Sequence, residues 1–297
     1  MSLFRKTLSN PYFLLTLTAI IWAGNAVAGR MAVGHVSPFL LTALRWTIAV
    51  AILLTFSLPY LKRDIAEIRK NRLFLFLLGA IGFTCFNILF YLALNYTTAI
   101  NVAIIQASMP LMVFALNFII FSIRATLPQI AGFVLTMIGV ALTVTHGDLL
   151  ALASQTFNKG DLIMLVAVLA YGGYSVMLVR KPDIHWISLI TVLGISALLA
   201  SLPFAAWEAL SGNMIVPDAK GMAIALYIAV FPAIVSQLLW IRGLDMIGSN
   251  RGGVFINMVP IFASGLAVLL LGERFHAYHA AAIVLVVTGV GLSQRRQ

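Results

Sequence analysis

Charged residues are scarce in this sequence: Asp, Glu, Lys and Arg make up 9% of the 297 residues, whereas 62% are hydrophobic. A soluble domain carries about 25% charged residues because its surface faces water. No stretch is polar enough to form a separate aqueous domain. The composition therefore excludes an ordinary soluble protein and predicts an all-α integral membrane protein in a lipid bilayer.

Residues for catalysis are also missing. The single Cys85 excludes an intrachain disulfide framework and a multi-cysteine metal site. There is no H-E-x-x-H motif, no pair of mid-span aspartates and no phosphate-binding G-x-x-x-x-G-K-[ST] loop. We therefore expect neither an enzyme nor an ATP-driven pump, and we expect no cofactor and no metal.

Acidic residues are absent from the middle of every apolar run, since Asp161, Glu208 and Glu273 all lie near the ends. The five histidines, at positions 35, 146, 185, 276 and 279, lie near the ends as well. A carboxylate within the membrane is the usual carrier of a coupling proton or sodium ion. The sequence thus predicts little or no ion coupling, with proton coupling through a terminal histidine or the substrate as the alternative.

What is present is a series of long apolar runs. A helix needs ~20 apolar residues to cross the hydrocarbon core. Such runs predict ten transmembrane helices, at 11–30, 37–58, 73–94, 98–121, 127–145, 161–179, 186–207, 221–241, 248–271 and 277–293. The runs are too long and too uniform for the strands of a membrane barrel.

Basic residues set the orientation of these helices. The net charge is +10, and of the 19 Lys and Arg residues only Arg30, Lys159, Lys220 and Arg274 fall on the side away from the N-terminus, with Arg45 inside a span. Because basic loops stay on the cytoplasmic side, both termini are expected in the cytoplasm of a plasma or bacterial inner membrane. Orientation explains the basic charge, so we expect no nucleic-acid partner.

The sequence repeats itself at an offset of 150 residues, which places Arg30 on Arg180 and Pro110 on Pro260. The repeat predicts a first five-helix unit at 1–145, a linker at 146–160 and a second unit at 161–297. Five is an odd number, so the units lie in opposite orientations, as two inverted five-helix repeats around a central cavity. Residues 26–28 resemble a signal-peptide cleavage site, but the first span has a counterpart in the second unit, which favours its retention.

Several short motifs resemble a known family: Trp22-Ala23-Gly24-Asn25, Leu44-Arg45, and Leu270-Leu271-Gly272-Glu273-Arg274-Phe275. The chain resembles the EamA-type transporters of the drug/metabolite transporter superfamily, and within them the YddG-type aromatic amino acid exporters. The resemblance implies ten helices, a central cavity and export of metabolites without ATP hydrolysis. The first half departs from the pattern, with Ser122-Ile123-Arg124 in place of Gly-Glu-Arg.

Polar and aromatic side chains inside the spans are the candidate site, because polar groups in a membrane usually face a cavity or another helix. The candidate substrate-binding residues are the amides Asn25, Asn87, Asn101, Gln237 and Asn257 and the aromatic residues Trp22, Tyr91, Tyr171, Tyr174 and Trp240. Amides suit the carboxylate and ammonium of an amino acid, and rings offer flat apolar walls. Ordinary packing between helices is the second interpretation of each residue.

Two prolines and one arginine complete the prediction. Pro110 and Pro260 fall at equivalent mid-span positions and are candidate hinges, with static bends as the alternative. Arg45 is interpreted as structural or gate-related, with binding of a substrate carboxylate as the alternative. The sequence predicts a secondary transporter, monomeric or weakly dimeric, that exports small metabolites such as amino acids with aromatic or apolar side chains by alternating access. A membrane channel or a non-transporting membrane subunit is the competing hypothesis.

Overall fold

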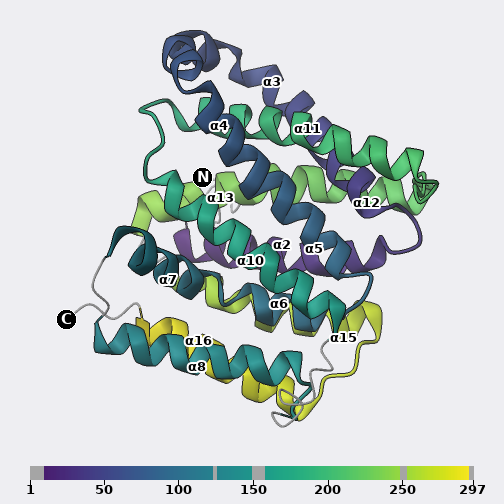
Figure 1. Cartoon of the computed structure of the whole chain (residues 1–297), viewed down its shortest axis with the longest axis vertical. Coiled ribbons are helices and arrows are strands. Elements are labelled where there is room, and N and C mark those ends of the chain that lie inside the picture. The colour runs from purple at the N-terminus through teal and green to yellow at the C-terminus, as the bar shows by residue number, and fades with distance from the viewer. Residues whose placement is uncertain (1–9, 123–125, 149–157, 248–252, 294–297) are drawn as a thin grey trace.

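The computed structural model describes residues 10–122, 126–148, 158–247 and 253–293, and every regular element in these ranges is helical. Figure 1 shows the helices lying side by side in one bundle, with their ends gathered at two opposite sides. The all-α prediction is confirmed for this part of the chain. The first and last residues of the predicted linker, 146–148 and 158–160, are described, while 149–157 lie outside the described residues.

The first half of the chain forms seven α-helices and one π-helical turn. They are α2 (Pro11–Met31), α3 (Pro38–Lys70), α4 (Arg72–Gly79), the π-turn η1 (Ala80–Cys85), α5 (Phe86–Ala93), α6 (Ala99–Gln106), α7 (Met109–Phe121) and α8 (Leu127–Val144). The helix starts follow from the sequence: Asn10 caps α2 by accepting hydrogen bonds from the N–H groups of Tyr12 and Phe13, and Pro11 occupies the first turn.

The second half repeats this order. It comprises α10 (Lys159–Leu178), α11 (Trp186–Leu210), α12 (Ala219–Val230), the π-turn η2 (Phe231–Val235), α13 (Ser236–Ile247), the 3-10 turn η3 (Gly253–Met258), α15 (Val259–Leu271) and α16 (Ala277–Ser293). The two π-turns therefore fall at equivalent places in the two halves. So do the left-handed residues that end α7 and α15, Ser122 and Gly272.

Eight helices in the described part are long and apolar enough to cross a membrane: Pro11–Met31, Pro38–Lys70, Arg72–Ala93, Ala99–Phe121, Leu127–Val144, Lys159–Leu178, Trp186–Leu210 and Ala219–Ile247. Each matches one of the first eight predicted spans. The last two predicted spans correspond to shorter apolar helices, Phe255–Leu271 and Ala277–Leu292. In the described residues the ninth begins with the 3-10 turn η3, and α16 has 17 residues.

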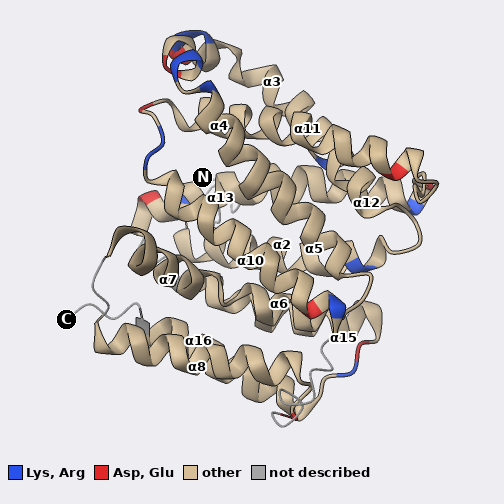
Figure 2. Ribbon diagram, viewed as in Figure 1, with Lys and Arg blue, Asp and Glu red and all other residues tan. Residues whose placement is uncertain are grey.

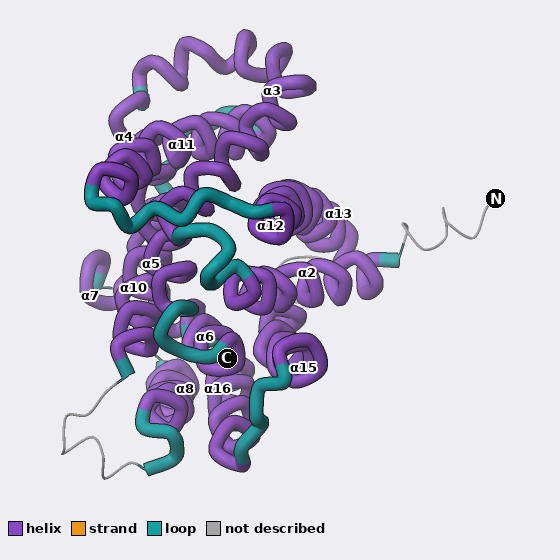
Figure 3. The backbone as a smooth tube through the Cα atoms, turned by 90° about the vertical axis from the view of Figure 1, so that its right-hand side faces the viewer, coloured by secondary structure: helices purple, strands orange, loops and turns teal. Residues whose placement is uncertain are grey.

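The two halves are interleaved and do not form separate bodies. The most extensive packing joins α8 to α16 and α3 to α11, and then α2 to α13 and α15, and α5 to α10. Each of these pairs takes one helix from residues 10–148 and one from residues 158–293. Figure 3, seen from the right of Figure 1, looks nearly along the helices and shows this mixing. The core therefore lies between the halves.

Most charged residues gather at the two ends of the bundle and leave a broad belt with few charges between them (Figure 2). The end that contains the turns 32–37, 94–98, 211–218 and 272–276, on the right of Figure 1, is here called the Asp161 end. The distribution matches a protein whose middle lies in hydrocarbon and whose ends lie in water.

Candidate functional site

A cavity of about 270 Å³ lies inside the bundle. Its walls come from both halves of the chain, and most of its surface is apolar. The lining residues include Trp22, Asn25, Arg45, Trp46, Gly82, Phe83, Phe86, Asn87, Gln106, Pro110, Tyr171, Pro232, Gln237 and Ile256. Ligand cavities in proteins typically measure ~300–1,000 Å³. The volume therefore suits a small molecule with one ring or one branched apolar group.

The cavity lies where four helices lose their regular hydrogen bonding. Gly82 of η1 and Pro232 of η2 both line it. The break between α6 and α7 and the junction of η3 with α15 supply further lining residues. Proline has no N–H to donate, and π-turns are frequent at functional sites. Interrupted helices around a midplane site are a recurring feature of secondary transporters.

Aromatic rings make up much of the wall. Trp46 stacks on Phe83 with ring centroids 4.7 Å apart, and Tyr171 packs against Phe86 at 5.0 Å. Trp22 packs against Trp240 at 5.2 Å and donates its indole N–H to Ser236 Oγ at 2.9 Å. The orientation of the Trp22 ring is therefore fixed from two sides, and the ring presents a rigid apolar surface to the cavity.

Amides from both halves meet in this cavity. Asn87 follows η1 and Gln237 follows η2, and these residues are equivalent under the 150-residue offset. Asn25 of α2 and Gln106 of α6 add two more amides. The predicted residues Trp22, Asn25, Asn87, Tyr171 and Gln237 are thus brought together around one space.

Arg45 of α3 is the one charged residue among those that line the cavity in the described part of the chain. It is 7% exposed. Its Nη1 donates to Asn25 Oδ1 at 3.1 Å and to Tyr91 Oη at 2.5 Å, and Tyr91 Oη donates in turn to Asn25 Oδ1 at 3.1 Å. Its guanidinium also lies 5.5 Å from the centre of the Trp46 ring. The arginine is therefore held in place by neutral partners.

Five of the predicted residues do not line the cavity. Tyr91 and Trp240 lie behind its wall and hold Asn25 and Trp22, and Tyr174 packs between Tyr171 and Phe83. Asn257 is buried beside the lining residue Ile256. Asn101 belongs to a separate polar cluster. The substrate-binding role of all ten residues stays a prediction.

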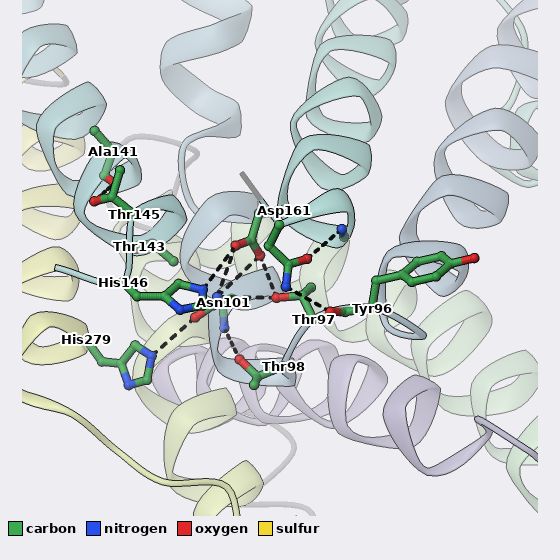
Figure 4. Close-up of polar contacts among 12 residues, drawn as sticks. Tyr96, Thr97, Thr98, Asn101, Ala141, Thr143, Thr145, His146, Asp161 and His279 are labelled. Atoms are coloured by element: carbon green, nitrogen blue, oxygen red, sulfur yellow. Dashed lines mark hydrogen bonds and ion pairs between the residues drawn. The ribbon is translucent and has the colours of Figure 1, made fainter. Parts of the chain in front are cut away.

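That separate cluster is centred on Asp161, which is fully buried near the start of α10 (Figure 4). Asp161 accepts hydrogen bonds from Thr97 Oγ1 at 2.5 Å and from Asn101 Nδ2 at 3.3 Å. His279 Nδ1 accepts from the His276 N–H, so Nε2 carries the proton and donates to Asn101 Oδ1 at 3.2 Å. The cluster joins α6, α10 and α16 at one end of the bundle.

Two further acids, the buried Glu208 and the partly buried Glu273, cap helices at the same end. Glu208 accepts hydrogen bonds from Ser37 Oγ at 2.6 Å and from the Leu40 N–H at 3.0 Å, at the start of α3. Glu273, in the Gly-Glu-Arg turn, accepts from the N–H groups of Ala99 and Ile100 at the start of α6. A carboxylate at a helix N-terminus satisfies free N–H groups and the helix dipole. The glutamate of this turn therefore has a structural role in the described chain.

The hinge candidates lie at breaks in the helices. Pro110 sits in the first turn of α7, directly after the interruption at residues 107–108, and lines the cavity. Pro260 occupies the equivalent place in α15, directly after η3. The arrangement fits either a hinge or a fixed bend.

The lining residues that sequence reasoning missed include three rings and one amide: Trp46, Phe83, Phe86 and Gln106. Gln106 had a readable signal, because an amide in an apolar run usually faces a cavity or a partner helix. The three rings gave no such signal, since phenylalanine and tryptophan side chains in a membrane helix are equally suited to contact with lipid and to packing between helices.

An apolar helical bundle with interrupted helices around a small internal cavity defines an integral membrane protein of the transporter class. The EamA-like transporter family model matches residues 10–145 and again residues 158–294. The chain therefore belongs to the EamA-like transporter family.

Its relatives include the uncharacterized transporter YyaM of Bacillus subtilis, 25% identical over 95% of this chain and 92% of the relative. An uncharacterized transporter of Archaeoglobus fulgidus is 27% identical over 97% and 99% of the two chains. The uncharacterized inner membrane transporter YicL of Salmonella typhimurium is 24% identical over 95% of each. A solved crystal structure superposes with a TM-score of 0.63 at 21% identity, covering 94% of each chain, which shows a shared fold.

Proposed function

We propose that this EamA-family transporter exports small metabolites, in particular amino acids with aromatic or apolar side chains, by alternating access at the described cavity. The observation that carries the proposal is the cavity itself, a small aromatic space with amides from both halves at equivalent points. Trp22, Asn25, Asn87, Tyr171 and Gln237 would contact the substrate. Tyr91 and Trp240 would position these residues.

The proposal includes ten membrane helices arranged as two inverted repeats, residues 1–145 and 161–297. The packing supports this arrangement, because its main helix pairs exchange under the 150-residue offset: α8 with α16, α3 with α11, and α5–α10 with α13–α2. Each half contributes five predicted spans, so the second half would run opposite to the first. Both termini would then lie in the cytoplasm, in keeping with the basic loops.

Little or no ion coupling is part of the proposal. Among the described residues no Asp or Glu lines the cavity. The buried acids Asp161 and Glu208 and the partly buried Glu273 lie near helix ends, where hydroxyl, amide or backbone donors satisfy them. Substrate movement would therefore follow the gradient of the substrate. An inward proton current that accompanies each substrate in voltage-clamped proteoliposomes would overturn this part.

The test is uptake of labelled phenylalanine, tryptophan, threonine and leucine into proteoliposomes, with Trp22→Ala beside the wild type. We expect saturable uptake that favours the aromatic amino acids. The Trp22→Ala variant should bind about tenfold more weakly, because ~1.4 kcal/mol of ring contact is lost.

Trp207→Ala is the matched control, since Trp207 lies at a helix end and is 59% exposed. Its uptake should equal that of the wild type. Non-saturating flux would favour a channel, and no uptake of any solute by well-inserted protein would favour a non-transporting subunit. Equal uptake by both variants would remove Trp22 from the site.

A further inference from the structure

The charge balance of the cavity is incomplete. Arg45 brings a guanidinium to the cavity wall, and no Asp or Glu lines that wall in the described part of the chain. No ion pair within the described residues includes Arg45. Holding a cation in a membrane interior without a counter-charge costs several kcal/mol. An anion that enters the cavity would remove this cost.

The hydrogen bonding of Arg45 is incomplete on one edge. Both printed partners, Asn25 and Tyr91, are bound through Nη1. Nε is buried and has no hydrogen-bond partner, and both side-chain hydrogen bonds of the guanidinium come from Nη1. Nε and Nη2 form the edge of a guanidinium that binds a carboxylate through two parallel hydrogen bonds. The unused edge therefore has the donor geometry that a carboxylate binds, and since Nε is enclosed by protein here, a two-bond contact needs the side chain or its neighbours to shift.

The other residues of the cavity wall indicate the size and polarity of the rest of the ligand. Trp22, Trp46 and Tyr171 offer apolar ring surfaces, and the volume is close to the lower limit for a ligand cavity. An ammonium group would find amide oxygens there but no carboxylate. It would also lie in the same cavity as the Arg45 cation, which repels it.

We infer that Arg45 is the binding residue for the carboxylate of the substrate, so that the cavity selects small organic monocarboxylates with an aromatic or branched apolar body. The carboxylate is required and the ammonium of an amino acid is dispensable. This inference rests on the proposed function of the cavity, and it changes the proposed substrate class from amino acids to organic monocarboxylates, with or without an amino group.

The experiment measures binding to the purified full-length protein in detergent for four compounds that share one apolar body. They are 3-phenylpropanoate, phenylalanine, 2-phenylethylamine and 3-phenylpropan-1-ol, which are an anion, a zwitterion, a cation and a neutral molecule. Wild-type protein should bind the anion at least as tightly as the zwitterion, and the amine at least tenfold more weakly than either. Inorganic phosphate and chloride are added as competitors, and neither should displace the anion.

Three variants test the assignment to Arg45. In Arg45→Gln the ratio of the affinities for 3-phenylpropanoate and the alcohol should fall at least tenfold, whereas Arg45→Lys should keep part of this preference. Arg30→Gln is the matched control, because Arg30 bonds the carbonyl of Leu94 at the Asp161 end and does not line the cavity. It should keep the wild-type order of ligands.

The inference is overturned if the amine binds as well as the anion, if Arg45→Gln keeps the wild-type preference, or if none of the four compounds binds. If Arg45→Gln fails to fold, the inference is tested by the order of ligand affinities in the wild type, Arg45→Lys and Arg30→Gln. Arg45→Lys should keep only part of the preference for the anion, and Arg30→Gln should keep all of it. Displacement by phosphate alone would identify an inorganic anion site and also overturn it. Anion binding without transport would instead overturn the proposed function and leave the role of Arg45 intact.

Discussion

Single residues differ in how their buried charge is satisfied. Asp161 is fully buried and accepts hydrogen bonds from Thr97 and Asn101, whereas Arg45 keeps one edge of its guanidinium without a partner. A satisfied buried charge is typical of a structural role, and an unsatisfied one invites a ligand. The same residue-level comparison therefore separates the Asp161 cluster from the cavity.

The structural role of Asp161 predicts the effect of Asp161→Asn. The new amide places N–H groups where the carboxylate accepted hydrogen bonds, so about 1–3 kcal/mol of stability should be lost. The measurement is the melting temperature of the purified protein in detergent. Asp183→Asn is the control, since Asp183 is exposed between α10 and α11. An equal melting temperature for the two variants would contradict this assignment.

At this scale, half of the ten predicted binding residues line the cavity. Trp22, Asn25, Asn87, Tyr171 and Gln237 line the cavity because amides and rings in the middle of spans have few other places to lie. Asn101 does not line it, because its partner Asp161 lies 60 residues away in the sequence. A contact of that separation follows from the packing of α6 against α10, which no local pattern encodes.

Helices pack closely where glycine removes the side chain. In the pair α8–α16, a Cβ on Gly289 would lie 2.5 Å from the Gly132 carbonyl oxygen, and a Cβ on Gly139 would lie 2.9 Å from the Ala282 carbonyl oxygen. These two contacts are equivalent under the 150-residue offset. Helices α8 and α16 therefore make the same close contact twice, and each helix supplies the glycine of one contact.

This close approach predicts opposite results for two glycines of one helix. Gly289→Ala should separate α8 from α16 and cost about 1–3 kcal/mol, as overpacking does. Gly291→Ala should be neutral or slightly stabilising, because nothing lies within 4 Å of its new Cβ and alanine favours a helix. Thermal unfolding in detergent compares the two. A Gly289→Ala protein as stable as Gly291→Ala would contradict the close contact.

The sequence predicted the elements better than their irregularities. Eight spans coincide with the predicted runs, but the π-turns η1 and η2 were not predicted. Pro232 gave a hint, since proline interrupts the helical ladder, whereas η1 contains only Gly82 at the equivalent place. A π-turn changes which N–H group bonds to which carbonyl, but it leaves the apolar pattern of the sequence unchanged. The sequence pattern therefore does not reveal it.

Across the whole molecule, the proposed cytoplasmic location of both termini predicts which surface faces which compartment. Cys85 is the single native cysteine, so its replacement by alanine gives a background without thiols. On this background Asn213→Cys, at the Asp161 end, should react in intact cells with a membrane-impermeant maleimide. Ala66→Cys, at the opposite end, should react only after the membrane is opened. The reverse pattern would contradict cytoplasmic termini.

The membrane class, the helical fold and the family all follow from the sequence, because apolar runs and their spacing are local properties. Which helices pack together does not. The pairing of α3 with α11 and of α8 with α16 depends on shape, as at Gly289, and on buried contacts such as Ser37 with Glu208. Such contacts join residues more than 100 positions apart.

The unpaired cation of Arg45 has an electrical consequence. If aqueous access to the cavity switches sides, as in the proposed alternating access, the charge crosses the transmembrane field although the side chain hardly moves, and each elementary charge is worth ~2.3 kcal/mol per 100 mV. An inside-negative voltage therefore favours the empty carrier open to the cytoplasm. Once a monocarboxylate without an amino group neutralises Arg45, reorientation is nearly independent of voltage. The resting potential of the cell would thus reset the empty carrier for the next export cycle.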